Sequence, residues 1–218
     1  LLLAGARLRG VRLATGEELH ADMVLFNGDV AALRSGALGT AVQQALWPGH
    51  RAPTPPDPAR RSLSAVTWHL AAATTGFELS HHNVFFSDPR AEGYRAEFDT
   101  IAQGRLPEQP TVYLCAQDRQ AVRSGQPGNV AAGPAVAERL MCLVNAPARA
   151  DQRPLSEEEI ARCEAQMWDR LAQAGLKLRP TTTSLRRSPA DFAQRFPATG
   201  GALYGEASHG WRASFQRP

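Results

Sequence analysis

Adjacent histidines are the first residues of this chain that could do chemistry. His81 and His82 stand together in LSHHNVFF, a stretch we expect to form a strand. Neighbouring side chains of a strand point to opposite faces, so these two rings are not expected to reach one metal ion. The sequence has no H-x-H, H-E-x-x-H or C-x-x-C spacing. The sequence therefore predicts no metal site.

Glycines near the end of the chain are a second candidate for chemistry. The run TGGALYG, residues 199–205, lacks the preceding strand and following helix that a dinucleotide fingerprint needs. Glycine allows backbone to approach a flat ligand closely, and Tyr204, His209 and Trp211 add ring surfaces. We expect a loop that faces a ligand. The alternative is a loop that only needs positive φ angles.

Composition excludes several classes of function. The chain has 24 basic and 21 acidic side chains, and its arginines are scattered instead of clustered with aromatic residues, so nucleic acid is not expected as a partner. Its three cysteines are an odd number, which is typical of a reducing, cytoplasmic compartment. Cys115 and Cys142 lie in apolar runs and are expected to be buried thiols. No apolar run is long enough to span a bilayer, and we expect a sequence taken from a longer one.

The elements that would position these residues follow from hydrophobic periodicity. We expect a hairpin at the front, then a buried strand at Met23–Phe26, because four apolar residues in a row are typical of strands buried on both faces. Further strands are expected at 62–71, 79–86, 111–117, from 138, and around Pro180 in 176–187. Helices are expected at 37–47, 91–103, 156–174 and 189–196. This pattern predicts an α+β fold with a largely antiparallel β-sheet and covering helices.

Three stretches resemble one family. They are GVRLATGEELHADMVLFNGDV, the middle segment HHNVFFSDPRAEGYRAEFDTIAQGRLPEQPTVYLCAQDR, and the closing FPATGGALYGEASHGWRASFQRP. Together they resemble FAD-dependent carotenoid desaturases of the bacterial phytoene desaturase type, within the flavin amine oxidase-like superfamily. The resemblance is nearest to the branch that introduces a 3,4 double bond into acyclic 1-hydroxy or 1-methoxy carotenoids.

The resemblance implies a domain organisation and a cofactor. Residues 1–29 correspond to a remnant of the flavin-binding domain, 30–199 to the substrate-binding domain, and 200–218 to a segment that returns toward the flavin domain. Gly200, Gly201 and Tyr204 would belong to a loop that faces the flavin. The chain has no G-x-G-x-x-G turn for the pyrophosphate, so we expect FAD in the full-length protein but not on this chain alone.

The resemblance also implies an apolar tunnel for a polyene carotenoid substrate. Candidate contacts are Trp68, Phe85, Phe86, Tyr113 and Met141, each with core packing as the alternative. Period-two alternation places Val84 and Phe86 on one face of a strand and Phe85 on the other.

Charged and histidine side chains near the strand at 111–117 and near the end of the chain could assist the reaction as acid or base. The acid–base candidates are Asp118, Arg119 and His209. A lipid-soluble substrate implies peripheral contact with a membrane surface, expected around residues 31–60, on a cytoplasmic protein. The rival functions are a carotenoid isomerase, another flavin oxidoreductase such as an amine oxidase, or a non-catalytic module that binds a polyene or lipid.

Overall fold

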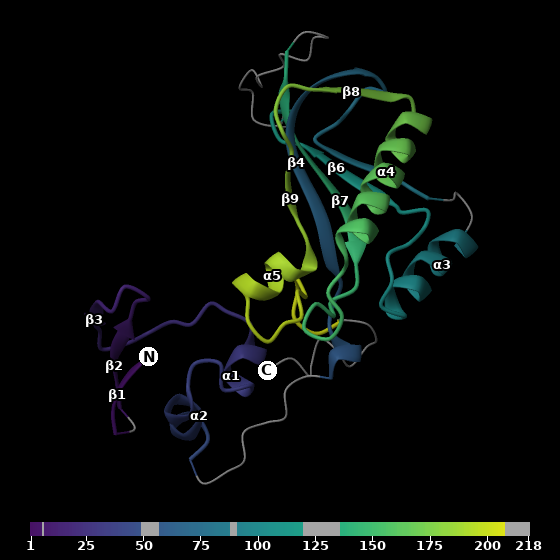
Figure 1. Ribbon diagram of the computed structural model, residues 1–218. Coiled ribbons are helices and arrows are strands. Elements are labelled where there is room, and N and C mark those ends of the chain that lie inside the picture. The colour runs from purple at the N-terminus through teal and green to yellow at the C-terminus, as the bar shows by residue number, and fades with distance from the viewer. Residues whose placement is uncertain (6, 49–56, 88–90, 120–135, 208–218) are drawn as a thin grey trace.

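The computed structural model describes residues 1–5, 7–48, 57–87, 91–119 and 136–207. These residues form a small three-stranded sheet at the front of the chain and a larger six-stranded sheet, with helices beside it (Figure 1). Every strand pairing in both sheets is antiparallel. The predicted α+β fold with a largely antiparallel sheet is confirmed.

The small sheet contains β1 (Leu2–Ala4), β2 (Arg7–Arg12) and β3 (Glu18–His20) in that order. The expected hairpin joins β2 to β3, and Gly16 adopts a φ of 90° in its turn. Two short helices follow, α1 (Val30–Arg34) and α2 (Thr40–Leu46), and α2 confirms the helix expected near 37–47.

The strand expected at Met23–Phe26 is wrong. These residues form no strand, and Met23 and Leu25 are 83% and 90% exposed. A run of apolar residues becomes a buried strand only when neighbouring strands and helices cover both its faces. No strand in the described part of the chain pairs with this segment.

The large sheet carries most of the core. Its strands are β4 (Ser64–Gly76), β5 (His82–Phe85), β6 (Val112–Ala116), β7 (Glu138–Ala146), β8 (Leu176–Pro180) and β9 (Leu185–Arg187). Their order is β5-β6-β7-β4-β8, and β9 also pairs with β4. The four strands expected between residues 62 and 146 are confirmed, as is the interrupted edge strand around Pro180.

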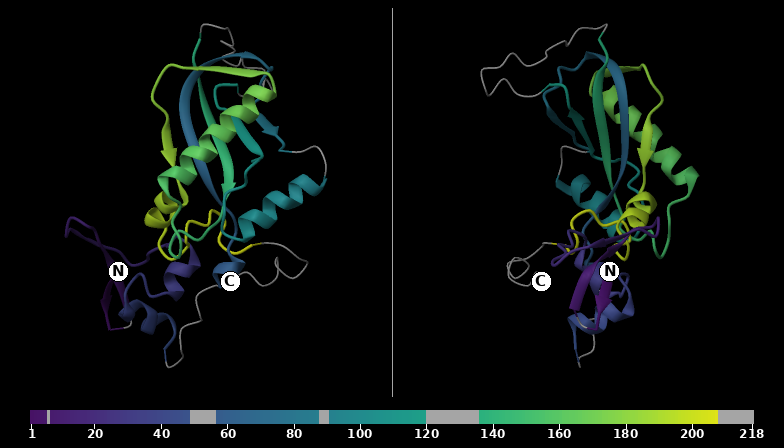
Figure 2. Two further views of the ribbon diagram at one scale, coloured as in Figure 1. Left: turned by 45° about the vertical axis from the view of Figure 1, so that its right-hand side comes forward. Right: turned by 90° about the vertical axis from the view of Figure 1, so that its left-hand side faces the viewer.

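Helix α4 (Glu157–Gln173) crosses one face of this sheet (Figures 1 and 2). Ser156 begins it with a capping box: Glu159 N–H donates to Ser156 Oγ, and Ser156 N–H donates to the Glu159 carboxylate. One side of α4 is buried against the sheet and carries Ile160, Cys163, Met167 and Leu171. Helix α3 (Ala91–Ala102) confirms the helix expected at 91–103, and α5 (Pro189–Arg195) the helix expected after Ser188. A short 3₁₀ helix, η1, covers Pro58–Arg60.

The two faces of the large sheet differ. On the face toward α4, which we call the covered face, the side chains are almost fully buried and include Trp68, Leu114, Leu140 and Val144. The side chains that alternate with them on β4, β6 and β7 point to the opposite face, which we call the open face. Most of these are only half-buried. In the right-hand view of Figure 2, α4 lies on one side of the sheet and no described helix lies across β6, β7 and β4 on the other.

Candidate functional site

The open face is built from two cross-strand rows. In one row, Val84 of β5 lies beside Tyr113 of β6, then Leu143 of β7, then Thr67 of β4. In the second row the corresponding residues are His82, Cys115, Met141 and His69. Side chains opposite one another on adjacent strands lie in contact range, so each row is a continuous surface across four strands. The result is a surface on which apolar side chains lie beside Thr67, His69 and His82 and which only partly excludes water.

Three of the predicted substrate contacts lie on or beside this open face. Tyr113 and Met141 are half-buried members of the two rows, and Phe86 follows β5 with 58% of its surface exposed. The alternation expected in this strand is confirmed, because Val84 is 49% exposed whereas Phe85 is 6% exposed. Leu143 belongs to the same surface and was not among the predicted contacts. The period-two pattern of ERLMCLVNA, the sequence of β7, contains the signal that would have found it.

Trp68 and Phe85 require a correction. Both are buried in the core on the covered face, with exposed fractions of 0% and 6%. Phe85 packs edge-on against Phe77, with ring centroids 5.2 Å apart. Their rings are used in packing below the sheet, which was the alternative for each, so they are not available to a ligand on the open face.

Aromatic rings border the open face at its β5 edge. Phe86 contacts Tyr94 of α3 in a T-shaped arrangement with centroids 6.3 Å apart, and Tyr94 contacts Phe98 at 4.8 Å. Tyr94 is 45% exposed. The helix period places Tyr94 and Phe98 on one side of α3, and the rings form an apolar rim where the sheet meets that helix.

Two histidines and a cysteine meet beside β5. The expectation that His81 and His82 point to opposite faces is wrong, because His81 lies in a bend before β5 begins and strand alternation does not apply to it. The two ring centroids are 4.3 Å apart. His81 Nε2 lies 3.8 Å from Cys115 Sγ, and His82 Nδ1 lies 2.7 Å from Tyr113 Oη.

Two titratable groups of the open face have shifted pKa values. Burial, with a contribution from the Cys115 side chain, raises the pKa of Tyr113, so its phenol is protonated at neutral pH. Burial, helped by the positive charge of Arg187, lowers the pKa of His69. His69 Nε2 lies 3.2 Å from Thr67 Oγ1, so the ring has a hydrogen-bond partner. A neutral imidazole and a neutral phenol suit an apolar surface.

The two acid–base candidates after β6 are engaged in separate ion pairs. Arg119 donates to both carboxylate oxygens of Glu138, to Thr74 Oγ1 and to the Leu79 carbonyl, at 2.6–3.0 Å. Its donors are therefore used inside the protein. Asp118 accepts from the side chain and backbone of Arg139, and this hydrogen bonding holds the pKa of Asp118 below its usual value. The sheet brings the two candidates to one end, but it does not bring either into the two rows. The third candidate, His209, lies outside the described residues.

The glycine-rich loop packs against its own chain. Gly200 and Gly201 adopt φ angles of 61° and 90°. A side chain on Gly200 would meet Arg61, the Ala148 carbonyl and Asp151, and one on Gly201 would meet the Pro189 carbonyl. These residues therefore pack closely against the backbone of the loop, and the role of the loop beside a flavin in the full-length protein stays a prediction.

Tyr204 stands differently in the same loop. Its side chain is 78% exposed, and its N–H donates to Ser62 Oγ at 3.0 Å. The Tyr204 ring is therefore exposed to solvent. Trp211, the other ring named with this loop in the sequence, lies outside the described residues.

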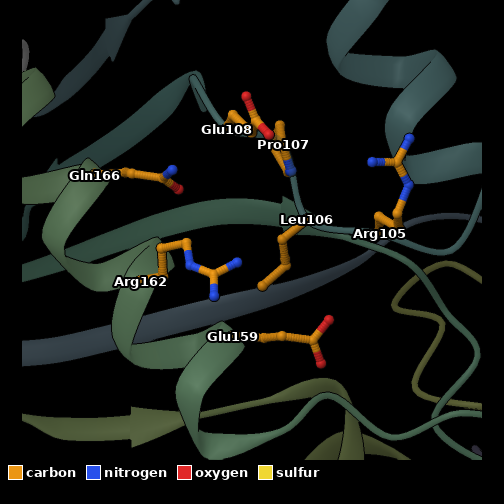
Figure 3. Close-up of a pocket in the computed structure, with 7 residues that line it drawn as sticks. All are labelled: Arg105, Leu106, Pro107, Glu108, Glu159, Arg162 and Gln166. Atoms are coloured by element: carbon orange, nitrogen blue, oxygen red, sulfur yellow. The ribbon is translucent and has the colours of Figure 1, made fainter.

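A separate hollow lies between α4 and the loop that precedes β6 (Figure 3). It has a volume of about 110 Å³ and is lined by four charged side chains, Arg105, Glu108, Glu159 and Arg162, with Leu106, Pro107 and Gln166. Pockets for organic ligands usually have volumes of about 300–1,000 Å³ and mainly apolar linings. This hollow is too small and too polar for a polyene.

Sequence comparison shows which proteins the chain is similar to. Over nearly its whole length it is similar to a segment of carotenoid desaturases. No protein-family profile matches it.

The particular relatives are hydroxyneurosporene desaturases. The chain is 48% identical over its whole length to that of Rubrivivax gelatinosus, covering 38% of the relative, and 42% identical to that of Cereibacter sphaeroides, covering 40%. It is 28% identical, over 94% of its length and 36% of the relative, to a zeta-carotene-forming phytoene desaturase of Myxococcus xanthus. The chain thus spans about two fifths of the length of its nearer relatives. The resemblance predicted from the three motifs is confirmed.

Proposed function

We propose that this chain carries the substrate-binding sheet of a carotenoid desaturase and that the polyene lies along the open face. The full-length protein would dehydrogenate an acyclic 1-hydroxy or 1-methoxy carotenoid between C3 and C4. The observation that carries the proposal is the contrast between the two faces of one sheet: α4 seals one, and the other exposes an apolar surface. The names of the relatives give the substrate class.

The physical basis is the match between a long apolar substrate and a long apolar surface. Strand β4 has 13 residues and extends over roughly 40 Å at the usual rise per residue. Binding is favourable when a polyene displaces water from the half-buried side chains of Met141, Leu143 and Tyr113. The stabilisation is about 25 cal/mol per Å² of apolar surface removed from water. The rings of Phe86 and Tyr94 would limit the substrate at the β5 edge.

The role of the chain in the reaction is to bind the polyene, to orient it and to exclude water from it. The resemblance assigns hydride transfer to FAD, and the residues that the structure describes form no phosphate-binding turn after a strand. An apolar surface that excludes water protects the reacting carbon from side reactions. We propose that Asp118 and Arg119 position the end of the sheet, since their charges are already paired.

Blocking the open face tests this proposal. In the full-length protein, Leu143→Trp should reduce desaturation of a hydroxylated acyclic carotenoid at least about tenfold, because an indole would fill the centre of the surface. The matched control is Leu13→Trp, at a leucine that is 40% exposed beyond β2, and it should leave the rate unchanged. Product analysis by chromatography and bound flavin content should be measured for both. An unchanged kcat/KM for Leu143→Trp, with normal flavin content, would contradict a polyene on this face.

A different flavin-dependent reaction on a carotenoid is the second candidate. It is favoured by the 28% identity to a 4,4'-diaponeurosporene oxygenase of Staphylococcus aureus, over 91% of this chain and 37% of that relative. The two reactions differ in mass: desaturation removes two hydrogens, whereas oxygenation adds oxygen. Mass spectrometry of the product distinguishes them.

We also propose that the full-length protein contacts a membrane surface through residues 31–60. None of the described helices is long and apolar enough to cross a bilayer. Helix α2 carries Leu46, which is 49% exposed. Leu46→Glu should release the full-length protein from floated liposomes if this helix makes the contact. Equal flotation of the variant would place the contact elsewhere.

A further inference from the structure

We infer that His81, His82 and Cys115 form a binding site for a transition-metal ion whose best match is Zn²⁺. The atoms that the three residues offer to a metal all lie within 4.8 Å of one another. Imidazole nitrogens and a cysteine thiolate are the donors that zinc takes in proteins. The inference stands on this geometry and does not depend on the desaturase proposal.

The distances are close to those of a tetrahedral site. Zinc–nitrogen and zinc–sulfur bonds of about 2.0 and 2.3 Å place neighbouring ligand atoms roughly 3.3–3.6 Å apart. His81 Nε2 and Cys115 Sγ are 3.8 Å apart, within a few tenths of an ångström of that value. The remaining adjustment falls mainly on His82, whose side chain is exposed.

The backbone holds the three residues in place. His82 and Cys115 are directly opposite in the register of β5 and β6. The carbonyl of His81 accepts a hydrogen bond of 2.9 Å from Ala116 N–H, which ties the bend before β5 to the end of β6. A site fixed by sheet pairing loses little conformational entropy on binding an ion.

The hydrogen bonds around the rings leave nitrogens free for the metal. His82 Nδ1 lies 2.7 Å from Tyr113 Oη, and when Nδ1–H donates to that oxygen the lone pair of Nε2 is available. A metal-bound histidine usually donates its other ring N–H to a second group, and the Tyr113 hydroxyl would take that place here. His81 Nδ1 is buried and has no hydrogen-bond partner among the described residues, so this ring is not committed to another group.

Three protein ligands leave a fourth position, which water or another oxygen ligand would take. Because Cys115 and His82 belong to the open face, that position lies at its β5 edge. The bound ion would join the edge strand β5 to β6.

Metal titration of the full-length protein tests the inference. The metal-stripped protein, carrying no histidine tag, is dialysed against Zn²⁺ alone, and bound zinc is measured by mass spectrometry. Titration with Co²⁺ is followed as a difference spectrum against the same protein without cobalt. We expect one strongly bound ion per chain and a sulfur-to-cobalt charge-transfer band. Cys115→Ser should abolish the band, and His82→Ala should weaken zinc binding at least about 100-fold.

Two further variants separate ligation from folding. Tyr113→Phe keeps the ring and should lower zinc affinity about 10–100-fold through loss of the second partner. Cys163→Ser removes a thiol of α4 that is 1% exposed and should not change the band. The inference is overturned if the wild-type protein binds no zinc at micromolar concentration, or if Cys115→Ser and Tyr113→Phe both bind it as the wild type does.

Discussion

The two faces of the large sheet use the same strands for different purposes. On the covered face, residues such as Trp68 and Cys142 are 0% exposed and pack against α4. On the open face, the residues that alternate with these along each strand remain half-buried, as Met141 does beside Cys142. Side chains change face at every residue of a strand, so a single apolar stretch supplies both a core and a binding surface.

The difference teaches which residues a function can change. A side chain in the core touches many others, and its loss leaves a cavity, so stability limits its variation. A half-exposed residue on the open face contributes less to stability and is free to be chosen for a ligand. The comparison predicts that, along one strand, substitutions on the covered face mainly change stability, whereas substitutions on the open face mainly change substrate binding.

The largest expected effect tests directly whether the two faces differ in their contribution to stability. Trp68→Ala should lower the free energy of unfolding by about 3–5 kcal/mol, because it removes a fully buried indole. Met141→Ala, on the open face, should cost about 1 kcal/mol. Urea unfolding followed by circular dichroism measures both. Equal losses would show that the open face is packed as tightly as the covered one, and would break the comparison.

Two ion pairs at one end of the sheet give the next test. Glu138 and Arg119 pair on the covered side with 8% and 17% of their side chains exposed, whereas Asp118 pairs with Arg139, which is 70% exposed. Glu138→Gln should destabilise by about 3 kcal/mol, because it leaves the Arg119 guanidinium without its charge partner. Asp118→Asn should cost less, since solvent screens its pair. The double variant Arg119→Met with Glu138→Leu should recover part of the loss, and no recovery would mean that the pair is not the cause.

Alternation explains how much of the fold the sequence predicts. Residues 138–146 alternate between buried and less buried positions and formed the expected strand β7, whereas residues 111–117, which are mostly buried, formed the expected strand β6. The expected start of the helix at residue 156 is correct, because the capping box of Ser156 and Glu159 depends only on local hydrogen bonds. Met23–Phe26 failed because burial of a strand depends on neighbours, which local pattern does not contain.

The candidate site was predicted less completely, for two physical reasons. Alternation sorts side chains into two faces, but it does not say which face a helix covers, so Trp68 and Tyr113 were equally good candidates. A strand boundary also moves by a residue or two, and His81 fell just outside β5. That one residue changes two diverging rings into two adjacent ones.

A smaller effect decides what the glycine-rich loop is for. Gly201→Ala should destabilise by about 1–3 kcal/mol, because the residue has a φ of 90° and its new methyl group would meet the Pro189 carbonyl. Gly175→Ala is the matched control: its φ is 84°, but its new methyl group would meet no atom within 4 Å. The difference between the two variants measures the contact alone. If both cost the same, the loop has room beside Gly201, and a ligand there becomes possible again.

The smallest effect concerns pH at the end of the sheet nearest that loop. Arg61 donates two hydrogen bonds of 2.7 Å to Asp151, and these lower the pKa of the Asp151 carboxyl. Because the pKa of Asp151 is lower in the folded than in the unfolded state, its charge stabilises the folded protein at pH values above the unfolded-state pKa. This contribution is lost as the pH falls through the folded-state pKa. The Asp151 side chain is 42% exposed, so the contribution should be below about 1 kcal/mol. The stability difference between wild type and Asp151→Asn should therefore be constant above about pH 5 and shrink over the range below about pH 4. A difference that stays constant over that range would show that Asp151 acts through packing around Gly200 and not through its charge.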